Sequence, residues 1–250
     1  MNPVGRSQGT LNNASLSFNL EEIDRHLPTG GIASGAAHEL YYHDPTNRLS
    51  VPSYLPSFLA YRTINSYYSE PSSSWDRYNT DHFPFFIVWI GRRCWPTPFS
   101  LPLRLLQSSL FIDPPTEKLT LWSIESSLRS PAVKLVISEC PRISLATTIR
   151  LNHVAKTNCT TALLLRQYND LMAPSSCATK WLVSPTPSPY SFPLWKLSLI
   201  KVRGGTPATL SWTIGMESGY GGREEIPLRV FSTMVNGRHQ EEAALKKFGA

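Results

Sequence analysis

The chain has 250 residues, of which 41% are hydrophobic and 17% are charged, and it carries a net charge of +6. This is enough apolar material for one sizeable domain with appendages. The basic excess is mild and is compatible with nucleic acid or an acidic protein as a partner. No stretch approaches the roughly 18 consecutive apolar residues of a membrane-spanning helix, and the amino-terminal stretch lacks the apolar core of a secretory signal. We therefore expect a cytoplasmic protein.

The amino-terminal part predicts a disordered start followed by the first core elements. Residues 1–17 are rich in Gly, Asn and Ser, which is typical of disorder. A short helix is expected over residues 18–28, with Asn19 as its cap and a proline at its end. After a Gly-Gly turn, residues 36–42 predict the first core strand, and a weak apolar repeat predicts a helix over residues 54–67.

Strands and helices then alternate along the chain. Continuous apolar stretches predict strands over residues 85–91, 109–115, 132–139 and 161–167. Between them we expect a helix capped by Thr116 and running to Ser130, and a second helix over residues 143–156. The second helix is expected to place Leu145, Ile149 and Val154 on its apolar side. This order predicts an α/β fold with a mostly parallel sheet and helices on both of its faces.

The pattern changes towards the carboxyl terminus. Residues 178–185 and 194–205 alternate between apolar and other side chains with a period of two, and residues 209–216 follow after a Gly-Gly turn. This predicts an antiparallel extension of the sheet. We therefore expect a disordered segment at 1–17, one domain over 18–216 and a loosely attached tail over 217–250.

No residue pattern predicts a metal site or a catalytic centre. The four cysteines, Cys94, Cys140, Cys159 and Cys177, lack C-x-x-C spacing, so we expect reduced thiols packed as small apolar groups. His38 and His43 would face opposite sides of a strand, so they do not favour a metal cluster with Asp44. We therefore expect no cofactor and no catalytic residues.

The stretch LPTGGIASGAAHEL (residues 27–40) is typical of the approach to a phosphate-binding loop. Such a Walker A loop needs glycines that let backbone amides wrap the phosphates, and a lysine that offsets their charge. No glycine occurs between Gly35 and Gly91, and the chain contains no Gly-Lys pair. ATP hydrolysis by the P-loop route is therefore not expected. Glu139, at the end of a predicted strand, could take the place of the acid that would orient Mg²⁺ or water. Its alternative roles are to cap the next segment or to form an ion pair with Arg142.

Basic residues next to tryptophan are candidate contacts with DNA or a protein partner, because such pairs stack on bases and bind acidic groups. The alternative is that the tryptophans fill the core while the basic side chains reach solvent at its rim. The candidates lie in one helix and in the carboxyl-terminal strands, namely Arg150, Lys180, Trp181, Lys196, Lys201 and Arg203.

Four stretches, in order, resemble the ImuA-type proteins, which are RecA-like accessory proteins of the bacterial damage-induced mutagenesis cassette, related to SulA-type cell-division inhibitors. They are LPTGGIASGAAHEL, LTLWSIESSLRSPAVKLVISE, PRISLATTIRLNHVAKTNCTTALLLR and SSCATKWLVSP…FPLWKLSLIKVRGG. The resemblance covers roughly residues 20–40 and 110–205. Residues 43–82 depart from the family pattern, and Lys180 and Lys196 stand where the family has arginine.

The resemblance implies a RecA-like core of the P-loop NTPase fold without a Walker A loop. It also implies an accessory role in DNA repair during the SOS response, namely in translesion synthesis and mutagenesis. The expected partners are a Y-family polymerase-like protein, an error-prone polymerase and RecA. Two alternatives stay open, a SulA-like inhibitor of cell division and a degenerate RecA-like ATPase. Direct DNA binding also stays open.

Overall fold

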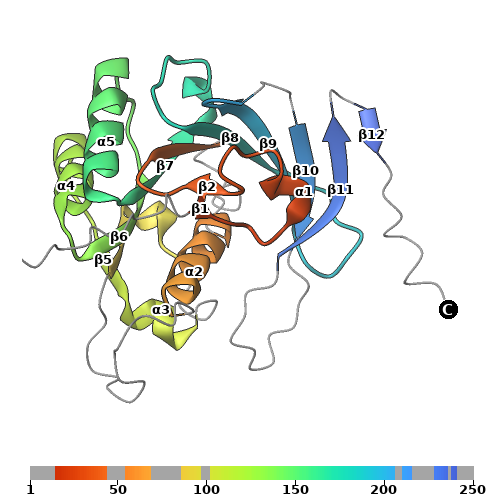
Figure 1. Ribbon diagram of the computed structural model, residues 1–250, viewed down its shortest axis with the longest axis horizontal. Helices are drawn as coiled ribbons and strands as arrows, with labels where there is room; N and C mark the ends of the chain where they lie inside the picture. Colours follow the sequence, from red (N-terminus) through yellow and green to blue (C-terminus); the bar gives the residue numbers. More distant parts are fainter. Residues whose placement is uncertain are drawn as a thin grey trace, which may run out of the picture.

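The computed structural model describes residues 15–43, 54–68, 86–96, 102–205, 210–215, 228–235 and 238–240. A ten-stranded sheet forms its centre (Figure 1). Six strands pair in parallel, and they are β3 (Ala37–Tyr42), β4 (Phe86–Ile90), β5 (Ser109–Ile112), β6 (Val133–Glu139), β7 (Thr161–Gln167) and β8 (Thr179–Thr186). Four more extend it by antiparallel pairing, and they are β9 (Leu194–Val202), β10 (Leu210–Gly215), β11 (Arg229–Val235) and β12 (Arg238–Gln240).

The strand order is β12-β11-β10-β9-β8-β3-β7-β6-β4-β5. β3, the first strand of this sheet in sequence, therefore lies in its interior between β7 and β8. The change from parallel to antiparallel pairing occurs at β8, which runs parallel to β3 and antiparallel to β9. The expected α/β fold with a largely parallel sheet and a carboxyl-terminal antiparallel extension is confirmed.

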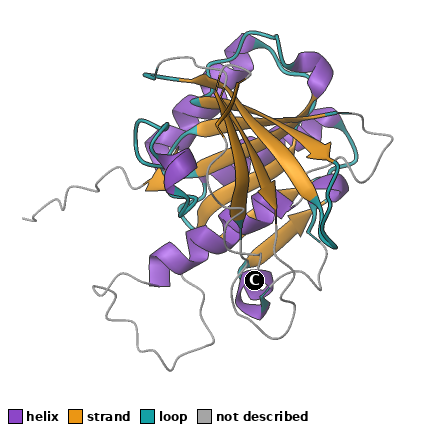
Figure 2. Ribbon diagram, turned by 90° about the vertical axis from the view of Figure 1, so that its right-hand side faces the viewer, coloured by secondary structure: helices purple, strands orange, loops and turns teal. Residues whose placement is uncertain are grey.

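Helices cover the sheet on both faces, as Figure 2 shows. One face packs against α4 (Glu117–Arg129) and α5 (Leu145–Asn158). The other face packs against α2 (Tyr54–Tyr68), α3 (Leu103–Gln107) and an amino-terminal unit. That unit consists of β1 (Ser15–Leu16), α1 (Glu21–Asp24) and β2 (Ile32–Ala33). Burial on both faces explains why the parallel strands are almost continuously apolar.

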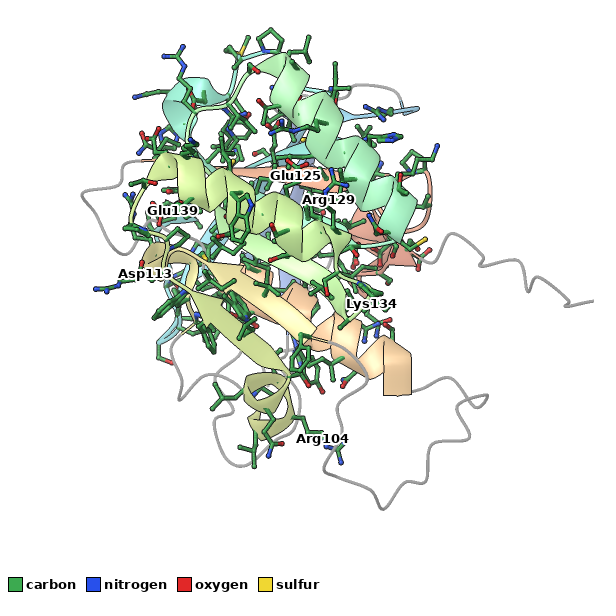
Figure 3. The ribbon with its side chains drawn as sticks, turned by 90° about the vertical axis from the view of Figure 1, so that its left-hand side faces the viewer. Arg104, Asp113, Glu125, Arg129, Lys134 and Glu139 are labelled. Carbon is green, nitrogen blue, oxygen red and sulfur yellow. The ribbon has the colours of Figure 1, made fainter. Side chains whose placement is uncertain are left out.

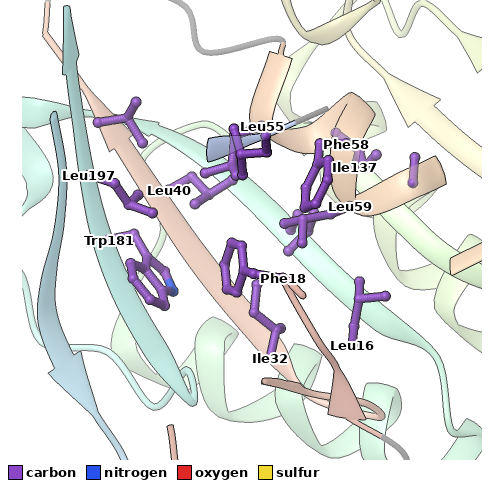
Figure 4. Packing of buried hydrophobic residues seen from close by; sticks show 14 of the residues in the cluster. Leu16, Phe18, Ile32, Leu40, Leu55, Phe58, Leu59, Ile137, Trp181 and Leu197 are labelled. Atoms are coloured by element: carbon purple, nitrogen blue, oxygen red, sulfur yellow. The ribbon is translucent and has the colours of Figure 1, made fainter. Parts of the chain in front are cut away.

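Buried aromatic side chains form the centre of the core under the amino-terminal unit, and Figure 4 shows Trp181 beside Phe18. Trp181 of β8 has no solvent exposure, and its ring lies 5.7 Å from that of Phe18 and 6.2 Å from that of Trp212. Aromatic pairs at these separations contribute more than their buried area alone. Trp181 is therefore a core residue, and its predicted role as a partner or DNA contact is wrong.

Helix α4 begins as its sequence predicts, whereas α5 begins at Leu145, two residues after its expected start. The Thr116 side chain accepts a hydrogen bond from the Leu119 amide over 3.3 Å, and that of Ser144 accepts one from the Thr147 amide over 3.2 Å. These caps satisfy amides that have no partner within the helix.

The predicted apolar side of α5 is partly wrong. Leu145 and Ile149 are 45% and 53% exposed, whereas the buried side consists of Thr148, Leu151, Val154 and Ala155. Thr148 tolerates burial because its hydroxyl donates to the Leu145 carbonyl and accepts from the Ser176 amide. The helix therefore turns a hydrogen-bonded threonine towards the sheet in place of the larger apolar residues.

The amino-terminal boundary differs from the sequence expectation. Residues 1–14 lie outside the described residues, but Ser15 and Leu16 form β1 and pair with β2. A side chain at Gly31 would approach the Leu16 carbonyl oxygen to 2.7 Å, so the glycine permits this pairing. Asn19 has a positive φ of 57° and does not cap α1, which is shorter than predicted and begins after Leu20.

The expected domain end at residue 216 is also wrong. β11 pairs with β10 over six Cα partners, so part of the expected tail belongs to the sheet. The antiparallel register places Trp212 opposite Thr233, and Thr233 is buried. Residues 216–227, 236–237 and 241–250 lie outside the described residues.

Two further observations bear on the class of protein. Within the described ranges, no helix is long and apolar enough to cross a membrane. The four cysteines are free thiols; three are buried, as expected, and Cys159 is exposed in a left-handed turn at the end of α5.

Candidate functional site

A cleft of about 590 Å³ opens at the carboxyl ends of the parallel strands. Each of five strands supplies a residue at or just beyond its end, and these are Tyr42, Gly91, Asp113, Glu139 and Gln167. Open α/β sheets bind their ligands in the crevice at this edge, because strand ends and helix starts meet there. The cleft is therefore the candidate functional site.

Glu139 lies at the wall of this cleft, at the end of β6. Its carboxylate pairs with the guanidinium of Arg93, which belongs to the short helix η1 (Arg92–Cys94) that follows β4. The sequence suggested a pair with Arg142, which is wrong. Arg142 instead lies 3.5 Å from the carboxylate of Asp170. The partner was missed because β4 and β6 are neighbours in space but about 45 residues apart in sequence.

Gly91 allows the backbone after β4 to run close to the Glu139 side chain. Its φ is +91°, and a Cβ at this position would come within 2.9 Å of the Glu139 Cβ. Both the left-handed backbone and the close approach favour glycine. The turn after β4 is therefore shaped around the side chain of Glu139.

The cleft holds a row of ion pairs. Besides Arg93 with Glu139, the Arg92 Nε donates to the Asp113 carboxylate over 2.6 Å, and Arg142 contacts Asp170. All three arginines are substantially exposed, so each pair contributes only about 0–1 kcal/mol to stability. The site thus presents alternating charges rather than a single-sign surface.

Two further titratable groups of this region, Tyr42 and Cys94, are held neutral by raised pKa values. Burial, and then the nearby charge of Glu139, raise the pKa of Tyr42 to about 12. Burial likewise raises the pKa of Cys94 to about 12, and its thiol donates to the carbonyl oxygens of Ile90 and Gly91. Nucleophilic cysteines need a lowered pKa, so Cys94 is a structural thiol. The described residues contain no group of three or more metal-ligating side chains.

A buried polar network lies behind the cleft. Arg166 of β7 pairs with Glu39 of β3, and its second terminal nitrogen donates to Asp170 over 3.3 Å. Asp170 ends the short helix η3 (Tyr168–Asp170) and also lines the cleft. The sequence signal for this network is a glutamate inside one largely apolar strand and an arginine inside another. Only the parallel register, which places Tyr41 opposite Arg166, brings them together.

Three predicted contact residues instead hold the loop that covers this network. Lys180 is buried, and its Nζ donates to the carbonyl oxygens of Leu171 and Ala173 over 3.0 and 2.6 Å. Lys201 donates to the Ser175 carbonyl over 2.6 Å, and Arg203 donates to that of Ser176. The expectation that Lys180 forms a surface contact is wrong. Lys201 and Arg203 already bind this loop.

The two remaining candidates do not form one surface with these. Arg150 is exposed on α5, where its Nε lies 3.2 Å from Glu125 of α4. Lys196 is exposed on β9, the strand that also carries Lys201, but it lies five residues, about 16 Å along the strand, from Lys201 and opposite Ser184 of β8. The structure therefore does not assemble the six candidates into a single interface.

Comparison of the sequence with models of known protein families gives no match, and comparison with curated proteins finds no similar sequence either.

Proposed function

We propose that the chain is a non-catalytic accessory protein of SOS-induced translesion DNA synthesis, with a RecA-like core that docks on polymerase-associated partners or on RecA. The four family-like stretches support the role. The α/β fold supports the core, because helices cover both faces of a sheet in which six strands pair in parallel.

The observation that carries the proposal is the ion pair between Glu139 and Arg93. In a nucleotide-hydrolysing site, an acid at the end of this strand would orient Mg²⁺ or water. Here the guanidinium offsets its charge. Residues 44–53, where a phosphate-binding loop would stand, lie outside the described residues, and their sequence has no glycine. These features favour a scaffold for protein contacts over an ATPase.

Calorimetric titration tests the non-catalytic part of the proposal. The full chain is expected to show no micromolar affinity for ATP, with or without Mg²⁺, and Glu139→Ala is expected to change nothing. Micromolar binding that is lost in Glu139→Ala would favour the degenerate ATPase, which Glu139 would serve from its place in the cleft.

Affinity capture from damage-treated bacterial cells tests the docking role. Recovery of a replication or recombination protein is the expected result. Filamentation of cells on overexpression, with an unchanged damage-induced mutation rate, would instead favour the division inhibitor.

A further inference from the structure

An aromatic cluster lies at one end of the antiparallel part of the sheet. Tyr190 and Phe192 of the loop between β8 and β9 form it together with Phe231 of β11. The rings of Tyr190 and Phe192 are parallel to within 2°, with their centroids 5.0 Å apart, and the Tyr190 ring lies 5.3 Å from that of Phe231. Tyr190 is nevertheless 47% exposed. The cluster therefore presents an aromatic ring to solvent.

The loop that carries this ring is held in place by Ser188. The Ser188 hydroxyl donates to the Phe192 carbonyl oxygen over 2.7 Å and accepts from the Tyr190 amide over 3.1 Å. Three prolines within residues 187–193 restrict the backbone further. A surface that is fixed before binding loses little conformational freedom when a ligand arrives.

Strand register places Lys196 on the same side of the sheet as the rings. A Cβ at Gly215 would lie 3.0 Å from the Phe231 ring and 3.3 Å from that of Phe192, so both rings lie on the side to which residue 215 points. Gly215 pairs with Leu194 of β9. Lys196 is two residues further along β9, about 7 Å away, and therefore points to the same side.

Hydroxyl groups flank Lys196 on the neighbouring strands. Ser184 of β8 and Thr213 of β10 lie opposite Lys196, and Ser232 of β11 lies opposite Thr213 with its hydroxyl 2.9 Å from that of Thr213. Lys196 is exposed and makes no hydrogen bond or ion pair with another residue in the described part of the chain. We call this surface the Lys196 face, and its members are Ser184, Tyr190, Phe192, Lys196, Thr213, Phe231 and Ser232.

The described helices on this side of the sheet leave the Lys196 face uncovered. Leu197 belongs to the core cluster of the opposite side, so Lys196 lies on the side of α4 and α5. These two helices lie side by side (Figure 3), and the core cluster beneath them contains residues of β3, β4, β6 and β7 but none of β9, β10 or β11. The open part of the face ends at Ser198 and Ser211, which pair with each other and are buried.

The strands that carry the face contain only basic charged residues. Strands β8 to β11 include Lys180, Lys196, Lys201 and Arg229 and no Asp or Glu. Arg229 is exposed and lies opposite Gly215, next to the aromatic cluster. The acids of the segment between β10 and β11 lie outside the described residues. The charge of the described strands therefore fits a polyanion.

We propose that the Lys196 face binds single-stranded nucleic acid, with a base stacked on Tyr190 and a backbone phosphate bound by Lys196. Aromatic rings that stack on bases and cations that follow the backbone are the two components of sequence-tolerant single-strand sites. A duplex keeps its bases stacked on one another and offers none to the ring. This inference goes beyond the docking role, which needs no contact with nucleic acid.

Fluorescence anisotropy of labelled oligomers tests the proposal on the full chain. The probes are oligo-dT and oligo-U of about twenty nucleotides, which exceeds the usual site size, and a DNA duplex of the same length. A single strand is expected to bind more tightly than the duplex, with an affinity that falls as salt rises. Either single strand supports the proposal, and the tighter one identifies the sugar. No binding, binding that salt does not weaken, or tighter binding of the duplex overturns it.

Two variants separate the ring from the charge. Tyr190→Leu keeps an apolar side chain against Phe192 but removes the stacking surface, so binding should weaken at least about fivefold. Lys196→Gln removes one phosphate contact, so the slope of log affinity against log salt should become shallower by about 0.7. Circular dichroism and thermal melting show that each variant is folded.

Matched controls lie elsewhere on the surface. Tyr168→Leu replaces a tyrosine that is 40% exposed at the end of β7, and Lys156→Gln replaces an exposed lysine of α5. Both should leave affinity and salt slope unchanged; losses equal to those of Tyr190→Leu and Lys196→Gln overturn the assignment. Binding of poly-glutamate as tight as that of the oligomers, with the same loss in Lys196→Gln, would show an acidic protein to be the occupant and also overturn it.

Discussion

Arg166 donates a hydrogen bond to the Glu39 carboxylate over 2.6 Å, and neither side chain is exposed to solvent. The same guanidinium nitrogen lies 3.2 Å from the Tyr41 hydroxyl, and the other terminal nitrogen reaches Asp170. Asp170 in turn contacts Arg142 at the cleft. A buried ion pair between two central strands is therefore connected to the candidate site through one carboxylate.

Removing one partner of this pair should be costly. Arg166→Met leaves the Glu39 charge buried without its partner, so we expect a loss of about 3–5 kcal/mol in the free energy of unfolding. Urea denaturation followed by circular dichroism measures it. The double variant Glu39→Leu/Arg166→Met removes both charges and should be more stable than Arg166→Met alone.

Glu125→Ala provides the control for this experiment, because the pairs of Glu125 with Arg129 and Arg150 are exposed. We expect it to cost less than about 1 kcal/mol. An Arg166→Met variant no less stable than Glu125→Ala would contradict the burial of the pair.

The parallel core was predictable because its strands are apolar throughout and its helices carry local start signals. Thr116 predicted the start of α4 by its residue type and position, and the apolar repeat predicted α5, which Ser144 caps. The buried side of α5 was not predictable by hydrophobicity, because Thr148 faces the sheet through hydrogen bonds to Leu145 and Ser176. Ser176 is distant in sequence, so no local pattern contains this information.

Gly91 provides a test of the candidate site's architecture. Gly91→Ala should destabilise the protein, because it combines a positive φ with a clash against Glu139. Gly204 has a comparable φ of +78° but no atom within 4 Å of an added Cβ. Gly204→Ala should therefore show only the backbone cost of a left-handed alanine, about 1–2 kcal/mol, and Gly91→Ala should exceed it in urea denaturation. Equal losses in the two variants would exclude the clash.

The candidate site was only partly predictable. Glu139 stands at a strand's carboxyl end, as its position after a buried stretch indicated, but its partner Arg93 depends on the β4–β6 pairing. The basic residue next to Trp181 did not identify a contact surface for DNA or a protein partner, for a different reason. Alternation along β8 shows that Lys180 and Trp181 face opposite sides, but not that the loop over residues 171–176 closes over the lysine.

Lys180→Met should loosen that loop, because it removes two hydrogen bonds to carbonyl oxygens. We expect a loss of about 1–3 kcal/mol in the free energy of unfolding and faster amide exchange in residues 168–178. Lys196→Met, at an exposed position of the neighbouring strand, is the control and should change stability by less than about 0.5 kcal/mol. Unchanged exchange together with weakened DNA binding would instead restore Lys180 as a DNA contact.

His38 is held in one neutral form by a chain of hydrogen bonds through the core. Its Nε2 lies 2.9 Å from the Ala33 carbonyl oxygen and must donate to it. Nδ1 then accepts from the Thr179 hydroxyl over 2.8 Å, and that oxygen accepts from the Trp181 indole over 2.7 Å. Protonation of Nδ1 would remove the acceptor that this chain requires. The adjacent His38 and Glu39 are thus both structural residues of β3.

The folding stability should therefore depend on the protonation of His38. Burial lowers its pKa from 6.5 to about 4. Between these values the unfolded chain binds a proton that the folded chain does not, so stability is complete above the unfolded pKa and falls as the pH drops towards 4. The expected loss is up to about 3 kcal/mol. Because other groups also titrate in acid, the measurement is the difference between wild type and His38→Gln in urea denaturation across this range. That difference should shrink as the pH falls, since only the wild type carries the histidine; a constant difference would show that His38 does not titrate between the two states.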